Sequence, residues 1–301
     1  ATARRAALRL ELAGELREAW WALADARNAR ALAQRRADTA RALDGDVARR
    51  YRAGELSRID ANLAQAETRA AQAELIEAEV ALLQAEQAYR ALTGAAAPAV
   101  LAEEATAPRP GGAPAVATLA ATSDAADHPL LAAAAADAAA ARARVRLAAE
   151  SNRAAPELAV RAVRERGDFN EPYANTIGIR LKIPFSAPAQ VRRETSAAQA
   201  EADRADAEMR RAQTRVGLDA ERARRALAAA QRQLALAQER LDLSAENLRL
   251  SEKAFALGES DLATLLRIRA AAFDTEAFLG RQRVARAAAL SRVNQAMGVL
   301  P

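Results

Sequence analysis

The stretch Tyr51-Arg52-Ala53-Gly54-Glu55 recurs as Phe255-Ala256-Leu257-Gly258-Glu259, and the offset between the two glycines is 258 − 54 = 204 residues. The same offset places Gly94 on Gly298 without an insertion. A glycine between two helical patterns can take the positive φ that ends one helix before the next begins. Two unrelated helical pairs could share a Gly-Glu turn, but the matching arm lengths favour a duplicated helical hairpin.

Long helical patterns extend outward from both turns. The first half predicts a helix over 1–43, a turn at Asp44-Gly45-Asp46, and a second helix that runs through the Gly54 turn to Leu92. The second half predicts helices over about 129–151 and 190–256 and a return to Met297. We therefore divide the chain into a first helical hairpin (1–94), an Ala/Pro/Gly-rich linker (95–129), a helix (130–155), a β-hairpin (156–186) and a second long helical hairpin (187–301).

Composition points to long packed helices and away from catalysis. Hydrophobic residues make up 51% of the 301 positions but aromatic residues only 3%, so the apolar content is mostly Ala and Leu. The net charge of +5 comes from 44 basic and 39 acidic residues, which are interspersed and form no basic stripe for nucleic acid. There is no cysteine, and the single histidine, His128, precedes Pro129 as a loop or capping residue would. No catalytic, cofactor-binding or metal-binding set is found, and we expect no enzyme.

The helices carry apolar residues on two flanks. Leu227, Leu234, Leu241 and Leu248 repeat every seven residues, and a second line of Leu236, Leu243 and Leu250 is displaced by two positions. In a 3.5-residue period these lines lie roughly 150° apart, so the helix needs a neighbour on each side. A ring of about twelve helices has that interior angle, although the middle of a solid bundle also offers two neighbours.

A short region between the helices changes to strand period. In Asn175-Thr176-Ile177-Gly178-Ile179-Arg180-Leu181-Lys182-Ile183-Pro184-Phe185, five apolar side chains alternate with glycine and two cations. Together with residues 156–166 this predicts a β-hairpin, with Ile177, Ile179, Leu181, Ile183 and Phe185 facing lipid and Arg180 and Lys182 facing a lumen. An ordinary amphipathic hairpin on a soluble domain is the alternative. An isolated hairpin is only marginally stable, so we expect other copies of the chain to complete the sheet.

The offset also bears on the first repeat. Subtracting 204 from the strand at 176–185 gives positions before residue 1, so we expect the matching hairpin upstream of the given sequence. Residue 1 already lies in a helical pattern and is not Met, so we expect the native N-terminus to be absent from it.

With these residues in place, the chain resembles the TolC-like outer-membrane efflux family over essentially its whole length. The motifs are the two Gly-Glu turns, the hairpin ending in Ile183-Pro184-Phe185, and the order of helices between them. The stretch 257–266 looks most like the heavy-metal (cobalt-zinc-cadmium) efflux branch. The resemblance implies a mainly α fold with a small β part, in which a homotrimer shares a periplasmic α-barrel and a 12-stranded outer-membrane β-barrel.

The same resemblance implies a passive export duct in a Gram-negative outer membrane, in contact with its lipid, with most of the chain in the periplasm. The turns would form the periplasmic tip, where the family meets a periplasmic adaptor (membrane-fusion) protein joined to an inner-membrane pump. The tip residues here are Gly54, Glu55, Leu56, Ser57, Leu257, Gly258, Glu259, Ser260, Asp261 and Leu262. No cofactor and no nucleic acid are implied.

Family gate aspartates lie six and nine residues after the second tip glycine, where this chain has Thr264 and Arg267, and the six-residue position of the first repeat is Asp60. The candidate gate is therefore Asp60, Thr264 and Arg267. Two other classes of function stay open: a periplasmic coiled-coil adaptor or scaffold, which would not explain the alternating strands, and a basic helical nucleic-acid binder.

Overall fold

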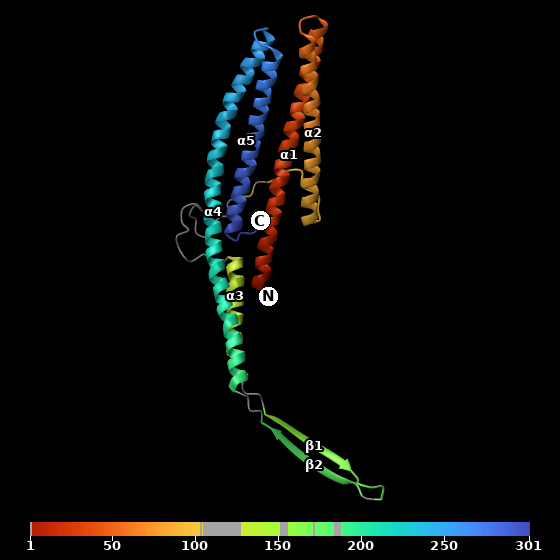
Figure 1. The fold of residues 1–301 in the computed structure, drawn as a ribbon, viewed down its shortest axis with the longest axis vertical. Helices are drawn as coiled ribbons and strands as arrows, with labels where there is room; N and C mark the ends of the chain where they lie inside the picture. Colours follow the sequence, from red (N-terminus) through yellow and green to blue (C-terminus); the bar gives the residue numbers. More distant parts are fainter. Residues whose placement is uncertain (1, 103, 105–127, 151–155, 171, 184–187) are drawn as a thin grey trace. The chain divides into compact units, whose positions relative to one another are not determined.

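The structure is a computed structural model that describes residues 2–102, 104, 128–150, 156–170, 172–183 and 188–301. Within these residues the chain is mainly helical with one β-hairpin, as the sequence predicts (Figure 1). The elements in chain order are α1 (Thr2–Arg52), α2 (Arg58–Thr93), α3 (Pro129–Glu150), β1 (Glu157–Glu165), β2 (Ala174–Lys182), α4 (Pro188–Ala256) and α5 (Leu262–Ala296). Most of the predicted linker, 105–127, lies outside the described residues.

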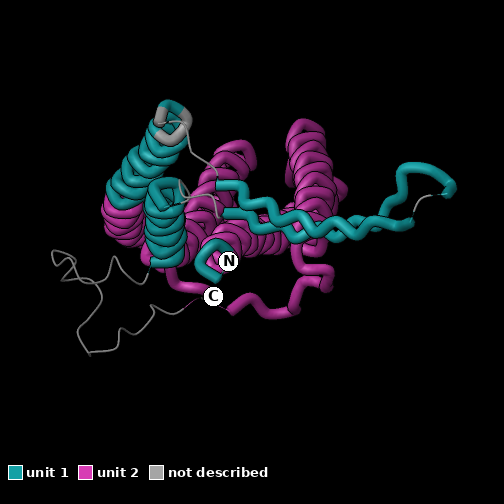
Figure 2. Tube along the Cα trace, turned by 90° about the horizontal axis from the view of Figure 1, so that it is seen from below, with its two compact units in different colours: residues 1–4, 125–215 teal, residues 5–124, 216–301 magenta. Residues whose placement is uncertain are grey.

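The chain forms two compact units, coloured separately in Figure 2. One unit contains residues 1–4 and 125–215, and the other contains residues 5–124 and 216–301. The long helix α4 contributes its first part to one unit and its last part to the other.

In the larger unit, α5 and α1 lie between α4 and α2 (Figure 1). Ion pairs connect the neighbours: Arg269 of α5 with Glu252 of α4 at 2.7 Å, and Arg35 of α1 with Glu276 of α5 at 2.6 Å. Arg36 of α1 reaches α2, where Glu74 lies 2.6 Å away. The helices α4 and α2 are therefore the two flanks of this unit.

All four helices contribute to a core beside the Gly-Glu turns. It consists of the buried residues Leu43, Val47, Ala64, Phe255, Leu262 and Leu265. The guanidinium of Arg50 lies 5.1 Å from the centroid of the Phe255 ring, so a cation–π contact adds to the apolar packing. Because the core draws on both repeats, it joins the two helical hairpins into one body.

The two turns match hydrogen bond by hydrogen bond, which confirms the repeat. Glu55 N donates to Arg50 O at 2.9 Å, and the residue 204 positions later, Glu259, donates to Ala254 O at 2.9 Å. Gly54 and Gly258 have φ of +81° and +76°, the left-handed conformation that ends a helix. The returning helices α2 and α5 have 36 and 35 residues, so the predicted equality of the arms holds to within one residue.

The turn predicted at Asp44-Gly45-Asp46 is wrong, because α1 is one unbroken helix from Thr2 to Arg52. Leu43 and Val47 flank Gly45 and are both buried in the core beside the turns. A helical glycine costs about 1 kcal/mol relative to alanine, whereas fully burying a Leu or Val side chain contributes about 1.5–3 kcal/mol. Core packing therefore outweighs the local preference of the Asp-Gly-Asp stretch.

In the smaller unit, α3 packs beside the first part of α4. Arg142 of α3 pairs with Asp206 of α4 at 2.7 Å, and small buried residues such as Ala138 and Ala202 allow close approach. His128 is buried ahead of α3, and its Nδ1 accepts a hydrogen bond from Leu130 N at 3.3 Å. The sequence predicts a loop or capping residue at this position, and the hydrogen bond to Leu130 N is a capping contact.

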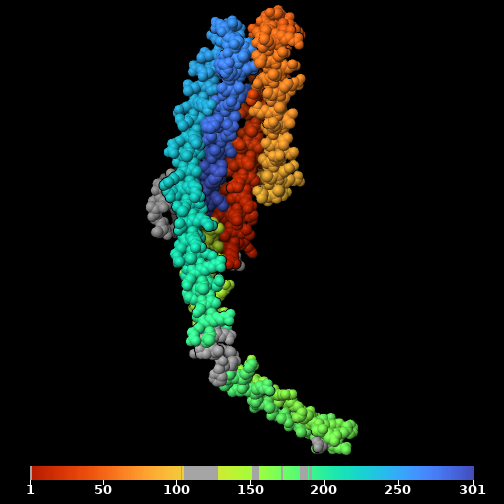
Figure 3. Space-filling model, in the orientation of Figure 1, coloured from red at the N-terminus to blue at the C-terminus, as the bar shows by residue number. Residues whose placement is uncertain are grey.

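The strands β1 and β2 pair antiparallel from Glu157↔Lys182 to Glu165↔Ala174 and form a sheet of two strands within the described chain. Every residue of β2 is exposed, and the hairpin can be followed in Figure 3. Side chains on β1 are exposed except for one of intermediate exposure.

Among the described residues, no helix is both long and apolar enough to span a bilayer.

We predict that Gly258→Ala destabilises the protein whereas Gly217→Ala stabilises it. Gly258 has φ of +76°, and placing alanine in the left-handed region costs about 1–2 kcal/mol. Gly217 lies inside α4 with open space around an added Cβ, so alanine there should contribute up to about 1 kcal/mol of helix propensity. Thermal unfolding of the two purified variants measures both effects. Shifts of the melting temperature in the same direction would contradict this account of the turn.

Candidate functional site

The two Gly-Glu turns place most of the predicted tip residues at the surface. Gly54, Glu55, Ser57, Leu257 and Gly258 are exposed, as are Glu259 and Asp261. Leu56 and Ser260 are partly buried, and Leu262 is buried in the core beside the turns. Leu262 therefore anchors the tip from inside, and the other residues form its outer surface.

The helices that leave the turns are capped by residues at the same two positions. The hydroxyl and carboxylate side chains at these positions are exchanged between the two repeats. In the first repeat, Ser57 is the N-cap and Asp60 completes a capping box, with the Ser57 backbone N–H donating to Asp60 Oδ2 at 3.0 Å. The positions 204 residues later are Asp261 and Thr264, and Thr264 N donates to Asp261 Oδ1 at 2.7 Å. Hydrogen bonds from the backbone and side chain of Thr264 lower the pKa of the Asp261 carboxyl.

This exchange bears on the candidate gate. Asp60, Thr264 and Arg267 all lie in the first two turns of α2 or α5. Asp60 and Thr264 are committed to helix caps, and Arg267 is exposed. In the first repeat the carboxylate, Asp60, lies three residues after the N-cap. In the second repeat the carboxylate, Asp261, is the N-cap itself, and Thr264 occupies the position that corresponds to Asp60. Sequence reasoning missed these caps, although the Ser-x-x-Asp pattern of the first repeat signals one.

A groove of about 440 Å³ lies beside the turn between α4 and α5. Its polar lining consists of Ser244, Asn247, Ser251, Ser260 and Thr264, and its apolar lining consists of Leu250, Ala254, Ile268 and Ala271. The Ser251 hydroxyl is buried there without a hydrogen-bond partner. A groove with hydroxyl groups and small apolar side chains can accept a partner helix by close packing and hydrogen bonding.

The β-hairpin has one apolar and one polar face. The register pairs Leu158 with Leu181, Val160 with Ile179 and Ala162 with Ile177 on one face. The other face carries Arg180 opposite Ala159 and Lys182 opposite Glu157, with 3.5 Å between Lys182 Nζ and a Glu157 carboxylate oxygen. Ile177 and Ile179 are 74% and 72% exposed, so none of the chain's own helices covers them. Ile183 is also exposed, and Phe185 lies outside the described residues.

The flanking helices carry the exposed apolar lines. On α4, Ala223, Ala230, Ala237 and Ser251 turn inward and are buried, whereas Leu236 and Leu243 on the opposite line are 64% and 66% exposed. On α2, the exposed apolar side chains include Ile59, Ile76, Val80 and Leu83. Of the two predicted leucine lines on α4, the 227/234/241/248 line is half-buried within the chain and the 236/243/250 line is uncovered.

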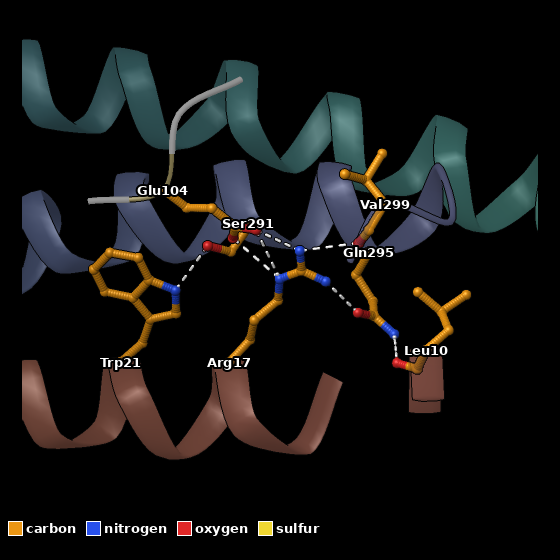
Figure 4. A network of polar contacts seen from close by, with 7 residues as sticks. All are labelled: Leu10, Arg17, Trp21, Glu104, Ser291, Gln295 and Val299. Carbon is orange, nitrogen blue, oxygen red and sulfur yellow. Dashed lines mark hydrogen bonds and ion pairs between the residues drawn. The ribbon is translucent and has the colours of Figure 1, made fainter. Parts of the chain in front are cut away.

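A buried polar network that the sequence did not reveal ties the segment after α2 to α1 and α5 (Figure 4). Arg17 of α1 is 7% exposed and pairs with Glu104, and it also donates to Val299 O at 3.0 Å. Gln295 accepts from Arg17 and donates to Leu10 O at 2.6 Å. Trp21 Nε1 donates to Ser291 Oγ at 2.9 Å. We call the Arg17–Glu104 ion pair the latch.

The latch holds Glu104 in its charged form. Burial alone favours the protonated acid, but hydrogen bonds from Arg17, Ser291 and Asn294 and the charge of Arg17 lower the pKa of Glu104. Two more bonds fasten the same segment, from Trp20 Nε1 to Ala102 O at 3.3 Å and from Arg27 to Pro98 O at 2.7 Å. The sequence around Arg17 does not predict this ion pair, because its partner Glu104 lies 87 residues away in the chain.

We predict that Glu104→Gln lowers the melting temperature at pH 7 and that this effect becomes smaller in acid. The lost interactions are hydrogen bonds to a charged group, worth about 2 kcal/mol. Because the folded-state pKa is lowered, the stabilisation is full above the ordinary glutamate pKa and is lost as pH falls through the lowered value. Thermal unfolding at pH 7 and at about pH 3.5 measures the difference.

The control is Glu79→Gln, which removes a carboxylate from the exposed Arg30–Glu79 pair at 3.5 Å. An exposed pair contributes at most about 1 kcal/mol, so this variant should differ little from the parent at either pH. Equal losses for the two variants at pH 7 would mean that the latch is no stronger than a surface ion pair.

Long paired helices, a duplicated turn and an uncovered hairpin with one apolar face define the class as TolC-like channel proteins. The family described as "Outer membrane efflux protein" matches residues 123–299, and the chain belongs to this family. The family consists of channels and not enzymes and lies in the outer membrane of Gram-negative bacteria. The expectations of a non-enzymatic protein and of this location are confirmed. No curated protein matches the chain.

Solved structures confirm the fold. The CmeC outer membrane channel of Campylobacter jejuni aligns with a TM-score of 0.78 at 14% identity, over 98% of this chain and 64% of CmeC. The MtrE outer membrane channel of Neisseria gonorrhoeae aligns at 0.74 and 20% identity, over 99% of this chain and 68% of MtrE. CusC aligns at 0.78 and 14% identity, over 99% of this chain and 71% of CusC. The chain thus spans about two thirds of the length of each channel.

Proposed function

We propose that the chain is a subunit of an outer-membrane export duct, a passive channel from the periplasm to the exterior. The observation that carries this proposal is the uncovered apolar face of the β-hairpin, with the cations of Arg180 and Lys182 on the opposite face. Such a hairpin fits a membrane barrel wall with one face toward lipid and the other toward water. Family membership sets aside the adaptor, scaffold and nucleic-acid alternatives.

We infer that the working form is a homotrimer. Within the larger unit, α4 and α2 are the flanking helices, and both expose apolar lines that the chain itself leaves uncovered. Placing α2 of one copy against α4 of the next would bury these lines and close the helices into a ring. Three copies also agree with the 12-stranded barrel of the family if each full-length subunit supplies two hairpins.

We further infer that the helical tip is the docking end for a periplasmic adaptor joined to an inner-membrane pump. The tip offers exposed backbone and acidic groups at both Gly-Glu turns, and the groove between α4 and α5 lies beside them. No group in the described chain is arranged to drive transport, so the energy would come from the pump. Among the described residues, no cluster of three His, Cys, Asp or Glu side chains is placed to hold a metal ion.

For the substrate, heavy-metal cations are the proposal that the sequence supports. It rests on the resemblance of residues 257–266 to the heavy-metal efflux branch. The alignment with CusC adds the fold alone, because the identity is 14%. A duct need not bind its cargo tightly. Three copies of Arg267 around a narrow pore would repel cations unless neighbouring carboxylates pair with them.

For the gate, Asp60, Thr264 and Arg267 stay the proposed positions. Hydrogen bonds in the helix caps hold Asp60 and Thr264 in place, because a capped helix start frays less than an uncapped one. Arg267 is then the residue of the three whose side chain is free of a cap and can change its contacts when the tip opens.

We predict that the full-length gene product fractionates with the outer membrane and has the mass of three chains in detergent. The expectation follows from the uncovered hairpin face and the uncovered lines of α2 and α4. Membrane fractionation and mass measurement by light scattering test it together. A soluble monomer would rule out the duct.

We predict that Asn247→Trp reduces adaptor binding about tenfold, because an indole would fill the groove between α4 and α5 and a loss of about 1.4 kcal/mol of packing corresponds to that factor. Binding of a periplasmic adaptor protein to the purified trimer provides the readout. Glu246→Trp is the matched control, because Glu246 is exposed on the same helix and does not line the groove. Unchanged binding of Asn247→Trp would place the adaptor elsewhere.

A further inference from the structure

The loop end of the β-hairpin carries an arginine–aromatic cluster that the duct function does not explain. The cluster consists of Arg164, Arg166, Phe169 and Tyr173. The Arg164 guanidinium lies 4.7 Å from the centroid of the Tyr173 ring, and that of Arg166 lies 4.8 Å from Phe169 and 5.1 Å from Tyr173. Arg166 also donates to Phe169 O at 3.3 Å. Two cations are thus held by stacking on aromatic faces.

The cluster continues the apolar face of the hairpin. Side chains alternate along a strand, so Arg164 follows Leu158, Val160 and Ala162 on one face of β1, and Arg166 lies one residue beyond the end of this strand. The register places Arg164 opposite Asn175, directly after the apolar pair Ala162↔Ile177. From Leu158 to Arg164 the face extends about 20 Å along the strand at 3.3 Å per residue, which a barrel tilt of about 40° converts to about 15 Å of height within a lipid-facing band of about 25 Å.

The two aromatic rings of the cluster are exposed. Phe169 is 80% exposed and Tyr173 is 53% exposed, so both rings face the surroundings although large apolar rings usually avoid water. Aromatic rings with a polar neighbour are favoured at membrane interfaces, and arginine extends its charge from an apolar surface into the headgroup layer. An arginine fork matches the oxygens of a phosphate.

We propose that this cluster is a binding site for the phosphate groups of outer-membrane lipid headgroups, with Arg164 and Arg166 as the phosphate ligands and Phe169 and Tyr173 as their supports. The proposal rests on the duct function, because only a hairpin that spans the membrane from the periplasmic side brings its loop end to the outer leaflet. Stacking removes part of the conformational freedom of both guanidinium groups before lipid binds, which lowers the entropic cost of binding.

The test uses full-length trimer in detergent and lipid A, a phosphorylated glycolipid, as the probe. Lipid A that stays with the protein through size-exclusion chromatography is quantified as phosphate per chain. We expect Arg164→Gln/Arg166→Gln to retain about tenfold less lipid A than the parent, since a charge-assisted contact is worth at least 1.4 kcal/mol. Arg164→Lys/Arg166→Lys keeps the charge but loses the fork and should lie between the two.

The matched control is Arg161→Gln/Arg180→Gln, which removes the same charge from the opposite face of the same hairpin. It should retain lipid A at the parental level and run as the same oligomer. Equal retention by the Arg164/Arg166 double variant would overturn the proposal. Equal retention of dephosphorylated lipid A by the parent would overturn it too, because contact would then be apolar only. Binding of inorganic phosphate as tight as that of lipid A would contradict a lipid site.

The outcomes also separate this proposal from the duct function. If the trimer is found in the outer membrane and the double variant still retains lipid A, the phosphate site fails and the duct stands. If the parent chain is absent from the outer membrane, both fail together.

Discussion

Backbone hydrogen bonding at the edges of the β-hairpin is the constraint on which the rest depends. β1 and β2 pair with each other along one edge each, and within the described residues no third strand satisfies the other edges. In hydrocarbon each unsatisfied N–H or C=O costs several kcal/mol, so a hairpin with a lipid-facing side needs further strands beside it. In the proposed duct, sister copies of the chain supply these strands and close the sheet.

The flanking helices also need neighbouring copies, because their exposed apolar side chains have no cover within the chain. Leu236 and Leu243 on α4 and Ile76 and Val80 on α2 stay uncovered because these helices are the flanks of the larger unit. The buried residues on α4 are mainly alanines, which allow close helix packing inside the chain. On α4 the large side chains face away from the chain and the small ones face its other helices. This arrangement fits a ring of repeated units, in which the large side chains would pack against the next copy. The latch between Arg17 and Glu104 fastens the segment after α2 within this body.

The sequence predicted those features whose signal is local or periodic. The 204-residue offset identified both turns, and the alternation at Ile177 and Ile179 identified the hairpin and its two faces. The turn at Asp44-Gly45-Asp46 failed because burial of Leu43 and Val47 outweighs local preference. The latch was missed because it joins residues far apart in the chain. The apolar side of the hairpin could be predicted from the alternation, whereas the stacking of Arg164 on Tyr173 required coordinates.

The central claim, that copies of the chain complete one another along α2 and α4, can be tested with cysteines because the 301-residue sequence contains none. Ile76 lies 76 − 54 = 22 residues after one tip glycine, and Leu236 lies 258 − 236 = 22 residues before the other. Oxidation of Ile76→Cys/Leu236→Cys in membranes should yield disulfide-linked dimers and trimers on a non-reducing gel, whereas each single variant stays monomeric there. A double variant that forms only an internal disulfide, or none, would contradict the account.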